Sequence, residues 1–320
     1  MIKAFSNKKV LIIGDVMIDR YVYGSVTRIS PEAPVPVLEW KKTENRLGGA
    51  ANVALNIKAL DAIPYLLGIA GDDDDGLLFR QLLTNESIEN QHIILVGDRP
   101  TTVKSRMMAG GQQLLRLDQE STKDNDEHTE GILLNKMRYL IENERIDVII
   151  FQDYNKGLLT KTMIKKALIL AQKYKIPTCV DPKKKNFTTF QNVTLFKPNL
   201  KEISAFLNKN IATNLDDLKL AAQEFRLKAN CQNLMITLSE KGIFIENEEN
   251  HSILPTTPRP IADVCGAGDT VISVAALGIA CGFDIGQIAA FCNIAGGQVC
   301  EEIGVVPINK ERFWKEINIV

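Results

Sequence analysis

The sequence predicts an α/β fold with a mostly parallel central sheet and a small β-flap. Short, continuous apolar runs rich in Val and Ile are typical of strands that are buried on both faces. Segments with helical periodicity separate these runs, and strands that alternate with helices form crossover units in a parallel sheet. Two further segments break the alternation and indicate strands that lie outside the main sheet.

Four apolar runs are the predicted strands of the main sheet. They cover residues 10–13, 147–151, 177–180 and 234–237. The predicted helices cover residues 50–60, 129–142, 160–174 and 215–229. Ligands of such sheets bind beyond the carboxyl ends of the strands, so polar residues near those ends are candidates for a site.

The predicted β-flap consists of residues 20–44 and 101–118. Prolines at alternating positions in the first segment are typical of edge strands. The second segment alternates in part and turns at Gly110-Gly111. Two separate surface hairpins are the alternative interpretation. We expect residues 1–320 to form one domain that carries this flap as a lid.

Composition and charge are those of an ordinary soluble protein. The net charge of −1 gives no field that would recruit nucleic acid or an anionic membrane. No apolar stretch reaches the roughly 18 residues of a membrane-spanning helix, and residues 1–9 are too polar for a signal peptide. The six cysteines form no Cys-x-x-Cys pair, so we expect reduced thiols in a cytoplasmic protein.

The strongest chemical signal is the glycine-rich turn Gly266-Ala267-Gly268-Asp269, which precedes an apolar helical pattern. Backbone N–H groups of such a turn point at one spot, and together with the helix dipole they favour an anion. Glycines let the backbone approach a phosphate without an intervening Cβ. Asp269 is placed to take the proton of an attacking hydroxyl. The alternative is that Asp269 only caps a helix.

A second glycine-rich segment, Gly48-Gly49, leads into another predicted helix, with Asn52 one turn later. Asp19 follows the first strand by a few residues. A carboxylate and a carboxamide near strand ends are suitable for holding sugar hydroxyls. Close packing of helix on sheet is the alternative reason for the glycines.

The two glycine-rich segments together resemble the two signatures of the ribokinase-like (PfkB) family of carbohydrate kinases. The resemblance covers essentially the whole chain and implies a three-layer α/β sandwich with a β-flap lid. Further motifs are similar to the branch that phosphorylates D-glycero-β-D-manno-heptose 7-phosphate on the route to ADP-heptose and lipopolysaccharide; they lie at residues 14–21, 28–37, 112–118, 153–157 and 180–183. Some members carry a fused adenylyltransferase, and because this chain ends at Val320 we expect a kinase alone.

The resemblance implies a role for each matched position. Asp269 matches the catalytic base, and Gly266, Ala267 and Gly268 match the anion hole. The sugar-contacting positions are Asp19, Gly48, Gly49 and Asn52; the ATP-side positions are Asn199, Glu202, Thr237, Ser239, Gly242 and Asn293. Glu202 would hold Mg²⁺ through water, and Asp263 falls where many relatives bind a monovalent cation such as K⁺. ATP and Mg²⁺ are therefore the expected cofactors.

A sugar that already carries a phosphate needs cations away from the transfer site. Lys104 and Arg106 alternate onto one face of a predicted flap strand, and Arg116 and Lys156 are further candidates. Asp153 lies in the Asp-Tyr-Asn-Lys-Gly motif and is a further substrate-binding candidate. For each basic residue, an ordinary solvated strand face is the alternative.

The expected partners are a sugar phosphate and a second copy of the chain, with no nucleic acid and no membrane. Flaps of relatives pair with a partner subunit, so we expect a homodimer through the flap; a flap that covers only its own site is the alternative. Cys265 stands where most relatives have Thr and could make the enzyme sensitive to thiol reagents. Asp72–Asp75 is interpreted as a helix start rather than a metal site.

The sequence leaves three alternative functions. A different PfkB-family kinase, for fructose, ribose or another phosphosugar, would keep the same turn and base. A sugar- or nucleotide-binding regulator without catalysis is less consistent with an intact Asp269. A dinucleotide-dependent oxidoreductase lacks its Gly-x-Gly-x-x-Gly motif after the first strand.

Overall fold

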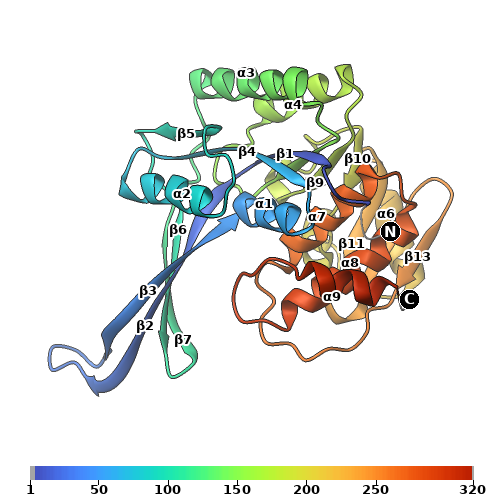
Figure 1. Cartoon of the computed structure of the whole chain (residues 1–320). Coiled ribbons are helices and arrows are strands. Elements are labelled where there is room, and N and C mark those ends of the chain that lie inside the picture. Colours follow the sequence, from blue (N-terminus) through green and yellow to red (C-terminus); the bar gives the residue numbers. More distant parts are fainter. Residues whose placement is uncertain (1–3, 319–320) are drawn as a thin grey trace.

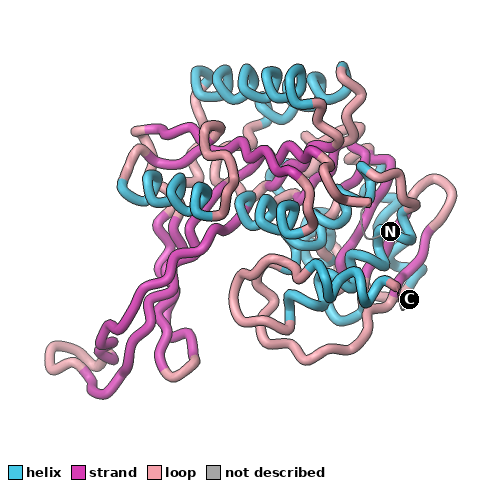
Figure 2. The backbone as a smooth tube through the Cα atoms, viewed as in Figure 1, coloured by secondary structure: helices cyan, strands magenta, loops and turns pink. Residues whose placement is uncertain are grey.

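The chain folds around one nine-stranded sheet with helices on both faces and a second, smaller sheet that projects from it (Figures 1 and 2). This computed structural model describes residues 4–318. The ends of the predicted domain 1–320, with part of the N-terminal segment 1–9, lie outside the described residues. No helix of this described part is long and apolar enough to cross a membrane.

The main sheet is parallel except at one edge. Its order is β13-β12-β11-β10-β9-β8-β1-β4-β5, with antiparallel pairing only at β12 and β13. The strands are β1 (Lys9–Gly14), β4 (Ile63–Gly71), β5 (Ile93–Val96), β8 (Val148–Gln152), β9 (Thr178–Asp181), β10 (Val193–Phe196), β11 (Cys231–Thr237), β12 (Ile243–Glu246) and β13 (His251–Leu254).

Two helical layers bury the two faces of this sheet. The helices are α1 (Ala50–Ala59), α2 (Asp74–Asn85), α3 (Glu127–Glu144), α4 (Lys161–Lys173), α5 (Leu200–Leu207), α6 (Leu215–Arg226), α7 (Ala267–Ala280), α8 (Ile285–Cys300) and α9 (Lys310–Ile317). Alternate residues of β1 divide between two cores: Val10 and Ile12 pack with α1, α2, α7, α8 and α9, whereas Leu11 and Ile13 pack with α3 to α6. Strands buried on both faces explain the continuous apolar runs of the sequence.

The second sheet is the lid. Its order is β3-β2-β6-β7, with strands β2 (Val16–Ile29), β3 (Pro36–Gly49), β6 (Val103–Ala109) and β7 (Gln112–Gln119). The predicted flap segments 20–44 and 101–118 lie in this one sheet, because β2 pairs in parallel with β6. They are therefore not two separate hairpins. Figure 1 shows the long β2–β3 hairpin standing away from the body.

The predicted fold class is confirmed, and each predicted strand and helix corresponds to an observed element. β4, β5, β10, β12 and β13 are not among the predicted strands. The acidic run begins a helix, as interpreted: Asp73 is the N-cap of α2, and its carboxylate accepts a hydrogen bond from the backbone N–H of Gly76 at 2.8 Å. Asp75, in the first turn, pairs with Arg20 of β2.

Candidate active site

The glycine-rich turn forms the start of α7, a helix whose residues are buried on nearly all sides. A helix that is apolar all round belongs in the interior of a protein, and α7 packs against α1, α8, β8 and β9. Gly266 is its N-cap and has a φ of 82°, which favours glycine. A Cβ at Gly266 would lie 2.9 Å from the Asn52 Nδ2 atom. The turn and the start of α1 are therefore in close contact.

Asp269 lies in the first turn of α7 and is 5% exposed. Its Oδ2 atom accepts a hydrogen bond from Asn52 Nδ2 at 2.8 Å. Its Oδ1 atom accepts two, from Gln152 Nε2 at 3.0 Å and from the Tyr154 hydroxyl at 2.6 Å. Burial raises the pKa of Asp269 to about 7, although the hydrogen bonds from Tyr154 and Asn52 oppose that shift. A carboxyl group with a pKa near neutrality is suited to general base catalysis.

Four polar residues that the sequence analysis did not select complete this site: Gln152, Tyr154, Asp181 and Lys197. All four lie at or just beyond the carboxyl ends of β8, β9 and β10. Asp181 Oδ2 contacts both Gln152 Nε2 and Lys197 Nζ, each at 3.2 Å. The carboxyl-end rule for parallel sheets was the signal that could have identified them.

Lys197 is a buried cation beside the turn. Its side chain is 3% exposed, and its Nζ atom would lie 3.9 Å from a Cβ built on Gly268. A buried lysine needs a counter-charge, which Asp181 supplies. The Nζ atom and the backbone N–H groups of the turn are therefore near neighbours, and together they can accept a phosphoryl group.

The predicted sugar-contacting residues come together between the lid and α1. Asp19 of β2 is 3% exposed and accepts a hydrogen bond from Arg106 Nη1 at 2.5 Å. A Cβ at Gly48 would lie 2.2 Å from Asp19 Oδ2. Gly49 has a φ of 59°, and a Cβ there would lie 2.5 Å from the backbone oxygen of Asp15. The glycines are thus also required for close packing.

The other predicted phosphate-binding cations are engaged in ion pairs. Lys104 Nζ lies 3.2 Å from both Asp118 and Glu120, and Lys156 Nζ lies 2.7 Å from Glu120. Arg116, half exposed, pairs with Asp118 at 2.8 Å. Of the four predicted cations, Arg106 is the one whose side chain forms an ion pair with a predicted sugar-contacting residue, Asp19.

Asp153 is buried and faces away from Asp269. Its carboxylate accepts hydrogen bonds from the Asn155 backbone N–H at 2.7 Å, from Asn186 Nδ2 at 2.9 Å and from the Lys183 backbone N–H at 3.4 Å. Burial, together with the nearby carboxylate of Asp15, raises the pKa of Asp153 to about 6. These contacts give Asp153 a part in holding the loop that carries Tyr154; its predicted contact with substrate stays a prediction.

The Asn-x-x-Glu motif forms a capping box at the start of α5. Asn199 Oδ1 accepts the Glu202 backbone N–H at 2.8 Å, and Glu202 Oε2 accepts the Asn199 backbone N–H at 2.9 Å. The other carboxylate oxygen of Glu202 pairs with Lys183. Glu202 and Asp181 are hard oxygen donors of the kind that Mg²⁺ prefers, so the residue types here fit that ion.

The remaining predicted ATP-side residues lie near the β11–β13 edge of the sheet. Thr237 ends β11, while Ser239 and Gly242 occupy the turn into β12 with φ values of 56° and 93°. Asn293 of α8 donates to the backbone oxygen of Leu254 at 3.0 Å. Beside it lies a cavity of about 220 Å³ lined by Leu254, Pro255, Thr256, Thr257, Arg259, Ala290, Asn293 and Ile294.

Asp263 and Cys265 hold the loop before the turn. The carboxylate of Asp263 accepts the backbone N–H groups of Cys265 at 3.0 Å and of Gly304 at 3.1 Å. Burial, and then the contact with Asp263, raises the pKa of the Cys265 thiol to about 11. Thiolate is the reactive form, so the structure argues against the expected sensitivity to thiol reagents.

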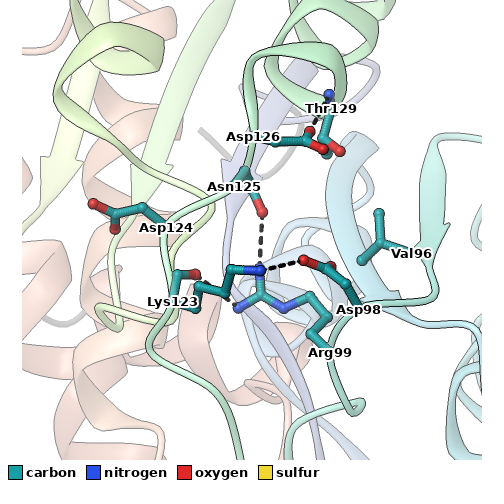
Figure 3. A pocket seen from close by; sticks show the side chains of 8 residues that line it. All are labelled: Val96, Asp98, Arg99, Lys123, Asp124, Asn125, Asp126 and Thr129. Carbon is teal, nitrogen blue, oxygen red and sulfur yellow. Dashed lines mark hydrogen bonds and ion pairs between the residues drawn. The ribbon is translucent and has the colours of Figure 1, made fainter.

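A second, very small cavity of about 10 Å³ lies at the base of the lid (Figure 3). Arg99 lines this cavity. It donates hydrogen bonds to Asn125 Oδ1 at 2.8 Å and to the backbone oxygens of Ser121 and Lys156. A space of this size holds about one water molecule. We therefore assign Arg99 a structural part, joining the lid base to the loop that follows Tyr154.

A family profile and curated proteins both match most of this chain. A sequence profile described as pfkB family carbohydrate kinase matches residues 7–312. Proteins named "Bifunctional protein HldE" are similar: that of Syntrophotalea carbinolica is 36% identical over 95% of this chain and 62% of its own length, and that of Haemophilus ducreyi is 39% identical over 98% and 64%. The chain thus spans less than two thirds of the length of these curated relatives.

Solved structures share the fold. Phosphofructokinase-2 from Escherichia coli in complex with potassium has a TM-score of 0.79 at 20% identity and covers 98% of this chain and 99% of its own. Ribokinase from Arabidopsis thaliana, complexed with ribose and ATP, has a TM-score of 0.73 at 16% identity, with the same coverage of both chains. These similarities confirm the predicted ribokinase-like architecture.

Proposed function

Because the chain belongs to the pfkB family of carbohydrate kinases, we propose that it uses ATP to phosphorylate D-glycero-D-manno-heptose 7-phosphate at the anomeric hydroxyl. The product is the 1,7-bisphosphate, an intermediate of ADP-heptose and lipopolysaccharide core synthesis in the cytoplasm. The main support for the proposal is the position of Asp269: this buried carboxylate, with a pKa near neutrality, lies in the first turn of the helix that begins at the Gly266–Gly268 turn. Similarity to the HldE proteins supports heptose as the sugar.

Asp269 acts as the base in this proposal. The two hydrogen bonds to Oδ1 occupy both lone pairs of that oxygen, whereas Oδ2 accepts only one, from Asn52. The sugar hydroxyl therefore approaches Oδ2 and gives up its proton there. The backbone N–H groups of residues 266–268 meet the charge that develops on the phosphoryl group.

ATP and Mg²⁺ are the proposed cofactors. Mg²⁺ would supply positive charge that offsets the charge of the ATP phosphates. Glu202 would hold it through water, next to the Asn199 cap, while Thr237, Ser239, Gly242 and Asn293 would line the nucleotide. Asp263 would support a monovalent cation such as K⁺ near the turn.

A coupled ATP-consumption assay over a panel of sugars tests the function. The panel contains heptose 7-phosphate, unphosphorylated heptose, fructose 6-phosphate, fructose and ribose. We expect the highest kcat/KM with heptose 7-phosphate. Turnover of fructose, ribose or another phosphosugar in its place would mean a different kinase of the family. ATP consumption with none of the sugars would instead favour a non-catalytic regulator.

We also propose a homodimer formed through the lid. Large apolar side chains on the lid are exposed, among them Trp40 at 67%, Ile29 at 61% and Leu115 at 61%. Burying such side chains between two copies is favourable. The Trp40→Glu variant is expected to sediment as a monomer where the parent protein sediments as a dimer. A parent protein that is monomeric at micromolar concentration would leave the lid as a cover for its own site only.

A further inference from the structure

Asp15 lies where three segments around Asp269 meet. It is the single residue between β1 and β2, and it is 2% exposed. Its backbone N–H donates to the backbone oxygen of Gln152 at 3.2 Å, and its backbone oxygen accepts the N–H of Ala50, the first residue of α1, at 3.0 Å. Gln152, and Asn52 in the first turn of α1, are two of the three donors to Asp269. The main chain of residue 15 therefore joins the segments that carry these two donors.

The carboxylate of Asp15 holds the loop that carries the third donor, Tyr154. Its Oδ2 atom accepts the backbone N–H groups of Tyr154 at 2.8 Å and of Lys156 at 3.1 Å. Its Oδ1 atom accepts the backbone N–H of Leu158 at 3.2 Å. The N–H groups of alternate loop residues thus point at one carboxylate. Of the three donors to Asp269, Tyr154 is the one whose position depends on the Asp15 side chain.

The backbone of the loop explains why it needs such an acceptor. Residues 153–158 lie outside the helices and strands, and Asn155 and Gly157 have φ values of 56° and 89°. These left-handed conformations turn the chain at alternate positions. The intervening N–H groups have no partner in a helix or a sheet, and buried N–H groups require one. The Asp15 carboxylate supplies it and thereby fixes the course of the loop.

Tyr154 links this loop to the candidate base. Its hydroxyl donates to Asp269 Oδ1 at 2.6 Å. Burial raises the pKa of Asp269, and the hydrogen bond from Tyr154 opposes that shift. Together with Gln152, Tyr154 occupies Oδ1 and leaves Oδ2 for the sugar hydroxyl. A displaced loop would free Oδ1, and the carboxylate could then turn either oxygen toward the substrate.

From these contacts we infer that Asp15 is a positioning residue, whose carboxylate fixes the 153–158 loop so that the Tyr154 hydroxyl holds Asp269 in its reactive orientation. The inference rests on the proposed function, because it takes Asp269 as the base. Asp15 acts through Tyr154: in the described part of the chain, no hydrogen bond joins Asp15 to Asp269 directly.

The charges near both carboxylates give the test a definite sign. The ionisable side chains around them come from several elements: Tyr154, Asp181 and Lys197 face Asp269, and Arg99 and Asp153 face Asp15. Removing the negative charge of Asp15 would by itself lower the pKa of Asp269. Losing the hydrogen bond from Tyr154 would raise it. An upward shift therefore reports the lost hydrogen bond and not the lost charge.

The pH dependence of kcat/KM tests the inference. The Asp15→Asn variant keeps the shape of the side chain, but its amide nitrogen cannot accept an N–H group. We expect kcat at high pH to fall about 10- to 100-fold, with a smaller change in KM, and the midpoint of the rise in kcat/KM to move up by about one pH unit. Tyr154→Phe should give the same upward shift. The double variant should shift no further, because both changes remove one and the same hydrogen bond.

Asp73→Asn is the matched control. Asp73 also ties down a loop through its carboxylate, which accepts the backbone N–H groups of Gly76 at 2.8 Å and of Thr101 at 2.9 Å and the Thr101 hydroxyl at 2.6 Å. Among the described contacts, none joins this loop, between β4 and α2, to Asp269. The control variant should lose thermal stability, as Asp15→Asn does, but keep the pH midpoint of the parent protein.

The outcomes distinguish this inference from the proposed function. If kcat/KM of the parent rises through about pH 7 and Asp15→Asn keeps that midpoint or lowers it, Asp15 does not position the base, and the proposed function stands. An additive shift in the double variant contradicts the inference in the same way. If Asp269→Asn retains the pH rise of the parent, the assignment of the base fails, and the inference fails with it.

Folding of the variants is checked by circular dichroism and thermal melting. Asp15→Ala, which removes the acceptor without placing an amide against the loop, serves as the second variant where Asp15→Asn does not fold. It carries the same expected shift in the pH midpoint. If neither variant folds, Asp15 is required by the fold as a whole, and its specific part in positioning Tyr154 is rejected.

Discussion

Replacing Asp269 with asparagine is expected to lower kcat by about 10²–10⁴-fold, because the amide cannot accept the proton of the sugar hydroxyl. Asparagine has nearly the same shape, and its oxygen can still accept hydrogen bonds from Gln152 and Tyr154. We therefore expect the fold to be retained. Steady-state kinetics with heptose 7-phosphate measure the loss, and near-normal turnover would exclude Asp269 as the base.

The pH dependence supplies the control for this prediction. The base acts in its deprotonated form, and the pKa of Asp269 is raised to about 7 by burial. In the parent enzyme, kcat/KM should therefore rise with pH through about 7, since kcat/KM reports the free enzyme. The residual activity of Asp269→Asn should lack that rise. An identical pH profile in both proteins would assign the titration to another group.

The Lys197→Met variant is expected to lose about 10²–10³-fold in kcat, comparable to removing one donor from an oxyanion hole. Lys197 is the buried cation nearest the Gly268 turn among the contacts described above, and a ligand phosphoryl group in that turn would lie within its reach. Methionine is similar in length and apolar, so the packing around the chain is largely kept.

Loss of Lys197 leaves the Asp181 carboxylate without its 3.2 Å partner, and an unpaired buried charge destabilises the fold. The double variant Lys197→Met/Asp181→Asn removes both charges and separates the two effects. Its Tm should recover toward that of the parent, whereas kcat should stay low. Recovery of kcat together with Tm would show that Lys197 is structural and does not meet the phosphoryl group.

Local features of the site could be predicted from the sequence, whereas features that depend on strand order could not. The glycine turn and Asp269 are contiguous in the chain, so backbone geometry alone predicts an anion site with a carboxylate beside it. Asp181 and Lys197 reach the site only because β9 lies between β8 and β10 in the sheet. The carboxyl-end rule makes such residues candidates, but no single run of residues indicates which strands are neighbours.

Among residues 152–154, a shift of one position along the chain decides whether a side chain contacts Asp269. Successive side chains of an extended segment point to opposite sides, so Gln152 and Tyr154 face Asp269 while Asp153 faces the loop below. Motif resemblance selected the central carboxylate, and the two flanking residues are the ones that contact the candidate base. The strands β4, β12 and β13 were missed for a similar reason, since their short or Pro- and Gly-containing runs lack a clear period.

Two lid strands, β2 and β3, join the body almost directly. A single residue, Asp15, separates β1 from β2, and β3 ends at the residue that caps α1. Because side chains alternate along a strand, gaining or losing a single residue between Met17 and Asp19 would turn Asp19 outward. The register irregularities of the hairpin, after Tyr23 and after Val26, lie toward its far end. Evolution can therefore lengthen or shorten this hairpin at its tip, whereas its root tolerates exchange of residues but no change in their number.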